Sequence, residues 1–100
     1  MSYLLTSKMI RFAPELSAQG ARHYYRTAPV VVVSDEPRAP LVDDMKALRL
    51  PFAKVYDLNE PMQPRLEQII EDWEITHVLG PVPIAGLPTV PLTFFTEKEE

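Results

Sequence analysis

Cysteine is absent from this chain of 100 residues, which excludes disulfides, thiolate metal sites and cysteine nucleophiles. The absence fits a reducing compartment, and we expect a cytoplasmic protein. Glycine occurs only three times, so no glycine-rich phosphate loop is present. No apolar run approaches the roughly 20 residues that a membrane helix needs, and the N-terminal stretch lacks the sustained apolar core of a signal peptide. The sequence therefore predicts a soluble protein without membrane contact.

Clustered positive charge is also missing. The 10 basic residues are scattered and are outnumbered by 14 acidic ones, which gives a net charge of −4. Direct nucleic-acid binding is not expected, because phosphate neutralisation needs grouped lysines and arginines. No serine stands in a hydrolase-like context and no histidine belongs to a metal-protease signature. We therefore predict a protein that is not an enzyme and needs no cofactor.

The apolar content of 46% is that of an ordinary globular protein, and the length suits one domain over residues 1–100. Four consecutive valines, Val30–Val33, are the strongest structural signal. Pro29 disfavours helix just before them, and β-branched residues on both faces of a strand require burial on both faces. This pattern predicts a central parallel strand with helices above and below it.

Apolar periodicity and proline positions predict the elements around that strand. Helices are expected at Pro14–Tyr25, at Pro40–Leu50 and along the stripe from Leu66 to Trp73, with Asn59 as the N-terminal cap of the last one. Further strands are expected at the following segments: Lys8–Phe12, Phe52–Leu58, Thr76–Leu79 and, at an edge of the sheet, Leu92–Thr96.

Strand and helix alternate from Val30 to Leu79, which is the pattern of an α/β protein. We predict a small single-domain α/β sandwich with a central, mostly parallel sheet of three to five strands and two to three helices. Three layers are expected, with two layers as the alternative because the Pro14–Tyr25 helix has a weak apolar face.

Proline is abundant: there are eleven, and they are dense between Pro81 and Pro91. Neither a helix nor a buried central strand persists through such spacing, so the stretch is predicted to be extended. A pre-ordered extended segment binds a partner at low entropic cost. The alternative is that its apolar side chains pack on the chain's own sheet. These candidate partner-binding residues are Val82, Ile84, Leu87 and Val90. Residues 97–100 are expected to form a frayed acidic tail.

A second candidate contact patch is Tyr24, Tyr25 and Arg26, which follow His23. Tyrosine and arginine are enriched at binding hot spots. The alternative is ordinary packing, in which the tyrosines cover the sheet and the charged group stays in water.

Acidic side chains follow two of the predicted strands. Asp35 and Glu36 come after the valines, and Asp57 ends the next strand. The carboxyl ends of parallel strands are where ligands bind, and carboxylate oxygens suit Mg²⁺. A Mg²⁺- or phosphate-binding site is therefore the alternative functional reading, against a purely structural role in turns and caps.

The segments V-V-V-V-S-D-E-P, T-H-V-L-G-P-V-P-I-A-G-L-P and V-P-L-T-F-F-T-E-K-E-E together resemble parts of a two-component receiver domain. The resemblance covers about two-thirds of the chain. It implies Mg²⁺ binding by Asp35 and Glu36 and a phosphoryl contact by Thr96. Gly80 stands where that family requires the phosphoacceptor aspartate, so phosphorylation at that position is not expected.

Together these observations predict a small non-enzymatic protein–protein interaction module, such as an adaptor, an inhibitor or an assembly subunit. It would present the proline-rich segment and acidic helical surfaces to another protein or to a second copy of itself. The acidic surface would be the face made by Glu67, Glu71, Asp72 and Glu74.

Overall fold

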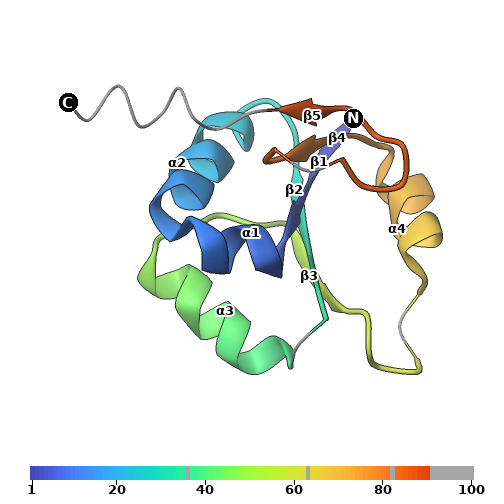
Figure 1. Cartoon of the computed structure of the whole chain (residues 1–100), viewed down its shortest axis with the longest axis horizontal. Helices are drawn as coiled ribbons and strands as arrows, with labels where there is room; N and C mark the ends of the chain where they lie inside the picture. The colour runs from blue at the N-terminus through green and yellow to red at the C-terminus, as the bar shows by residue number, and fades with distance from the viewer. Residues whose placement is uncertain (36, 63, 82, 91–100) are drawn as a thin grey trace.

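A five-stranded parallel sheet forms the centre of the computed structural model, which describes residues 1–35, 37–62, 64–81 and 83–90 (Figure 1). The strands are β1 (Ser2–Thr6), β2 (Val30–Ser34), β3 (Lys54–Asp57), β4 (Ile75–Leu79) and β5 (Thr89–Val90). The helices are α1 (Ser7–Phe12), α2 (Pro14–Tyr24), α3 (Arg38–Ala47) and α4 (Leu66–Trp73). The predicted α/β fold with a parallel sheet is confirmed, with five strands among the described residues, but there are four helices where two to three were expected.

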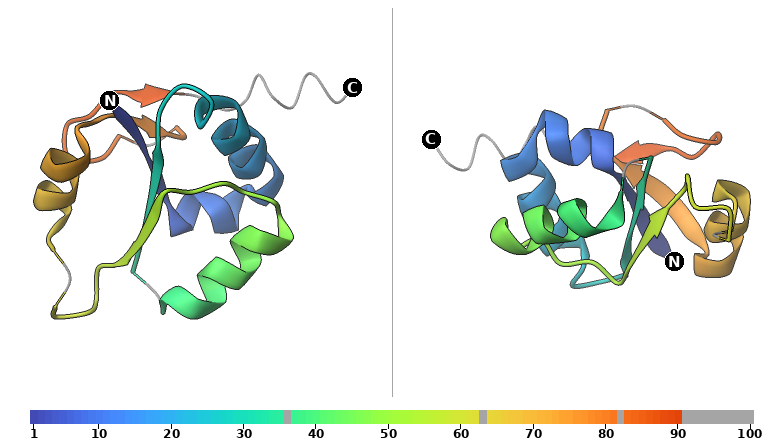
Figure 2. Two further views of the ribbon diagram at one scale, coloured as in Figure 1. Left: turned by 180° about the vertical axis from the view of Figure 1, so that it is seen from behind. Right: turned by 90° about the horizontal axis from the view of Figure 1, so that it is seen from below.

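The order of the strands is β3-β2-β1-β4-β5, with every pairing parallel. Helices α1, α2 and α3 cover one face of the sheet and α4 covers the other, so the molecule has three layers (Figures 1 and 2). The chain builds outward from β1 through β2 to β3, then returns to place β4 on the other side of β1. Such a reversal of direction is a topological switch point, where open α/β sheets bind their ligands.

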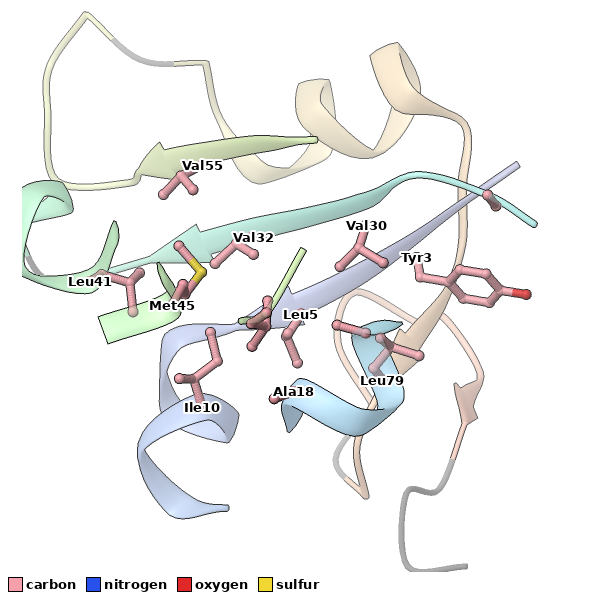
Figure 3. Packing of buried hydrophobic residues seen from close by; sticks show 13 residues of the cluster. Tyr3, Leu5, Ile10, Ala18, Val30, Val32, Leu41, Met45, Val55 and Leu79 are labelled. Carbon is pink, nitrogen blue, oxygen red and sulfur yellow. The ribbon is translucent and has the colours of Figure 1, made fainter. Parts of the chain in front are cut away.

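The valine strand is buried along its whole length, as its composition predicts. Val30 and Val32 point to the face that carries α1, α2 and α3, where they pack with Leu5 and Met45 (Figure 3). Val31 and Val33 point to the other face and belong to the cluster that α4 covers. Strand residues alternate between faces, so a strand without polar positions needs cover on both sides, and this sheet provides it.

The prediction of a strand at Lys8–Phe12 is wrong. The first strand is Ser2–Thr6, and Ser7–Phe12 is helix α1. The Thr6 hydroxyl accepts a hydrogen bond from the Met9 backbone N–H at 3.2 Å, which caps the helix where the strand ends. Thr6 stands three residues before Met9, whose backbone N–H needs an acceptor. This spacing is the local signal that marks where the strand ends and the helix begins.

The helix predicted at Pro40–Leu50 begins two residues earlier and ends at Ala47. Its stripe is as expected: Leu41 and Met45 are fully buried, and Val42 and Leu48 pack beside them. Arg49 takes a left-handed φ of 57°, which terminates the helix before Leu50.

Asn59 does not cap α4, which begins only at Leu66. Arg65 is extended at ψ 161°, so the helix begins only after it. The buried and half-buried stripe that was expected on α4 is present and belongs to the second core cluster.

Trp73 contributes a hydrogen bond across that cluster. Its indole Nε1 donates to the Tyr56 hydroxyl at 2.9 Å, so the polar atom of a half-buried ring is satisfied. We expect Tyr56→Phe to lower the free energy of unfolding by about 1 kcal/mol, because the indole N–H loses its acceptor. Chemical denaturation followed by far-ultraviolet circular dichroism, a signal that does not depend on Trp73, measures the loss.

The control for this pair is the same substitution in a Trp73→Phe background. Tyr56→Phe should cost much less there, because no indole N–H remains to be left unsatisfied. An equal cost in both backgrounds would show that the hydroxyl acts through other contacts.

After β4 the chain turns at Ala85 and Gly86 and then adds a short edge strand, β5, parallel to β4. Ala85 and Gly86 both have positive φ, 52° and 78°, and the Leu87 N–H donates to the Ile84 carbonyl at 2.9 Å. This tight turn returns the chain so that Thr89 and Val90 pair with β4. The sequence predicted loop here and an edge strand at Leu92–Thr96; the edge strand in the described part is Thr89–Val90, while Leu92–Thr96 and the tail 97–100 lie outside the described residues.

Candidate binding pocket at the switch point

A pocket of about 430 Å³ lies at the carboxyl ends of β1 and β4. These are the two strands between which the chain reverses direction. The start of α1 forms one wall and the segment after β4 forms the other. The residues that line it are Thr6, Lys8, Met9, Phe12, Val78, Leu79, Gly80, Pro81 and Ile84.

The walls are mainly apolar. Val78 and Leu79 are buried at the end of β4, and Met9 and Ile84 are half-buried on opposite sides. Phe12 stands at the rim with 82% of its surface exposed. An aromatic side chain that is open to water beside an apolar hollow can be removed from water when an apolar group is bound, which favours binding.

Gly80 shapes the floor of the pocket. Its φ of 131° lies in a region that side-chain-bearing residues rarely adopt, and a Cβ there would stand 3.1 Å from the Met9 sulfur. Its N–H donates to the Val90 carbonyl at 2.9 Å, which ties the floor to the edge strand. The glycine therefore allows β4 to end directly against α1.

Two polar side chains are among the described residues that line the pocket. The Thr6 hydroxyl is engaged as the cap of α1. Lys8 is exposed and forms no ion pair with any residue that the structure describes. Among the described lining residues there is no carboxylate and no imidazole, so the pocket has no paired acid and base for proton transfer.

The carboxylates predicted from the sequence lie at a different part of the same edge. Ser34 and Asp57 are register partners, so the ends of β2 and β3, and with them Asp35 and Asp57, are indeed side by side. Asp57 Oδ1 accepts the Asn59 N–H at 3.0 Å in a turn, and the Asn59 side-chain amide donates to the Asp35 carbonyl. These contacts match the structural alternative of turn formation.

Glu36, the third residue of the proposed Mg²⁺ site, lies outside the described residues. Within residues 1–35, 37–62, 64–81 and 83–90, no three acidic or histidine side chains are grouped so that they could hold a metal ion. Mg²⁺ binding at Asp35, Glu36 and Asp57 stays a prediction.

The receiver resemblance fails on the order of the strands. It requires the strand before Asp35 to lie next to the strand that ends at Gly80, but β1 lies between them. The sequence could not show this, because the strand at Ser2–Thr6 was not recognised. Thr96, the expected phosphoryl contact, lies outside the described residues.

The three residues of the second candidate contact patch, Tyr24, Tyr25 and Arg26, differ in their exposure. Tyr24 packs against the core, with its ring centroid 4.9 Å from that of Tyr3 and 4.8 Å from that of His23. Burial, with a smaller contribution from Tyr3, raises the pKa of the Tyr24 phenol above its ordinary value of 10.0. Tyr25 and Arg26 are exposed at the end of α2. Partner binding by these three residues stays a prediction.

The described candidate residues of the proline-rich stretch face inward. Ile84 and Leu87 pack against the cluster under α4, and Val90 packs against the cluster on the other face. Val82 lies outside the described residues. The segment thus makes contacts with its own sheet, and of its three described candidates Ile84 lines the pocket.

Sequence reasoning missed the α1 side of the pocket: Thr6, Lys8, Met9 and Phe12. The predicted strand at Lys8–Phe12 would place Lys8, Met9 and Phe12 within the sheet. Helix α1 instead places them at the pocket beyond the end of β1. The cap formed by Thr6 is the signal that would have found them.

No protein-family model, no curated protein and no solved structure matches this chain. Among the described residues, none of the helices has the length and apolar character to cross a membrane.

Proposed function

We propose that this chain is a small non-enzymatic binding module that holds an apolar ligand in the pocket between β1 and β4. The observation that carries the proposal is the apolar hollow at the switch point with exposed Phe12 on its rim. Its volume of about 430 Å³ falls in the range of small-molecule sites, roughly 300–1,000 Å³.

The lining supports binding over catalysis. Apolar walls contribute affinity by removing the ligand's surface from water, and this requires no reactive group. Lys8 is the only ionisable side chain among the described lining residues, so that lining holds no base or acid to activate it. Lys8 is also exposed to water.

A protein partner was the expectation from the sequence. That interpretation relied chiefly on a projecting proline-rich arm, whereas Ile84, Leu87 and Val90 are engaged with the chain's own core. A pocket of this volume suits a small ligand better than it suits the broad flat surface that protein interfaces use.

The test uses the uncharged dye N-phenylnaphthylamine, which fluoresces in apolar surroundings. We expect its emission to rise with the wild-type chain and its affinity to fall severalfold in Phe12→Ser, because that substitution removes one apolar wall. Phe12 is 82% exposed, so the fold should tolerate the change.

Met62→Ser is the matched control, since Met62 is 90% exposed and does not line the pocket. It should bind the dye as the wild type does. Absence of dye binding, or equal losses in the two variants, would contradict the proposal.

A further inference from the structure

Among the described residues that line it, the pocket combines apolar walls with one cationic side chain, Lys8. Met9, Leu79 and Ile84 supply apolar surface from three separate segments of the chain. Lys8 stands in the first turn of α1, exposed and without an ion-pair partner among the residues that the structure describes.

The charge at this mouth differs from that of the molecule as a whole. The chain has a net charge of −4, and no acidic side chain is among the described residues that line the pocket. A ligand that places an anion here meets Lys8 without a competing carboxylate in the lining. A cationic ligand would be repelled by Lys8.

The lysine side chain suits this position. Its four-carbon stem can lie along apolar surface while the ammonium group stays at the water boundary. An ammonium group also pairs with an anion as a point charge, so it does not demand a fixed ligand geometry. The apolar walls and the single charge would then contact different ends of one molecule.

We infer that the pocket takes an amphipathic monoanion: a small molecule with an apolar chain held against Met9, Leu79 and Ile84 and a carboxylate paired with Lys8. This inference names the ligand class for the proposed function and rests on it. It is independent of the carboxylates at Asp35 and Asp57, which lie at the ends of other strands.

The test compares three probes that share one chain length and differ in the head group: octanoate, octylammonium and octanol. Each is titrated into the ¹⁵N-labelled full chain, and amide shifts are followed at Thr6, Met9, Gly80 and Ile84. We expect octanoate to bind about fivefold to tenfold more tightly than octylammonium, the scale of one partly screened ion pair.

Lys8→Glu is the decisive variant. Octanoate affinity should fall about tenfold and the preference between octanoate and octylammonium should reverse, because attraction becomes repulsion. Lys46→Glu is the matched control, since it makes the same change in net charge at an exposed site on α3 outside the pocket. Its octanoate affinity should stay within about twofold of wild type, the scale of a screened distant charge.

The outcomes separate the two proposals. If all three probes shift the pocket amides with equal affinity, or if Lys8→Glu and Lys46→Glu behave alike, the anionic ligand class is wrong while apolar binding stands. If none of the probes shifts these amides, both proposals are wrong. Shifts confined to residues outside the pocket would also overturn both.

Discussion

A chain that stops at Gly80 is expected to be less stable than the full chain by about 3 kcal/mol, because the deleted segment contributes to both core clusters. Ile84 and Leu87 pack under α4, and Val90 packs on the opposite face. Each is half-buried, so each contributes about half of the 1.5–3 kcal/mol that full burial of such a side chain provides.

Backbone hydrogen bonds would be lost as well. The Val78 N–H donates to the Pro88 carbonyl and the Gly80 N–H to the Val90 carbonyl, both at 2.9 Å. Without β5, strand β4 becomes an unprotected edge of the sheet. The prolines at 88 and 91 flank β5, and prolines of this kind are a common defence of sheet edges against pairing with other chains.

Urea denaturation compares the chain that stops at Gly80 with the full chain and with a chain that stops at Val90. The chain that stops at Val90 keeps all the described contacts of the segment and should unfold near the wild-type midpoint. If the shorter chain unfolds at the same midpoint as the full chain, the segment does not belong to the core, and its role as a partner-binding arm regains support.

This experiment addresses a question that the sequence left open. Alternating prolines and apolar residues from Pro81 to Pro91 are consistent both with a projecting arm and, slightly better, with a segment that crosses its own sheet. Proline restricts the backbone but does not decide which surface it lies on, so the choice depends on contacts with residues far away in the sequence. The turn at Ala85 and Gly86 makes those contacts possible, because it reverses the chain toward β4.

Elements with strong local signals were predicted well. The four valines at Val30–Val33 require a strand that is buried on both faces. The apolar stripe from Leu66 to Trp73 has helical spacing. The first twelve residues carry no such signal, since the apolar run at Tyr3–Leu5 is too short to be assigned by period alone. The pocket could not be located for the same reason, because one of its walls depends on where β1 ends.

Strand β1, which the sequence pattern predicted at the wrong residues, is also the strand on which the sheet depends most. β1 pairs with β2 on one side and with β4 on the other, so it joins the two halves of the sheet. Leu4 and Leu5 are both fully buried, and as strand neighbours they point into opposite clusters. Two consecutive leucines without exposure are a consequence of this central position.

We expect Leu5→Ala to lower the free energy of unfolding by about 3 kcal/mol, in the range for a buried leucine that leaves a cavity behind. Leu5 packs between the sheet and the helices on its face, near Ile10 and Ala18 (Figure 3). Because a domain of this size has a total stability of about 5–15 kcal/mol, the loss is a large share of it. Thermal and urea unfolding of the purified variant measure the change.

Leu58→Ala is the matched control, because it removes the same atoms from a side chain that is 37% exposed and belongs to neither cluster. It should cost less than about 1 kcal/mol, as surface substitutions do. If Leu5→Ala is no more costly than this control, Leu5 is not a core residue and β1 is not the centre of the sheet. The pocket between β1 and β4 would then lose its structural basis too, so this variant tests the platform on which both binding proposals stand.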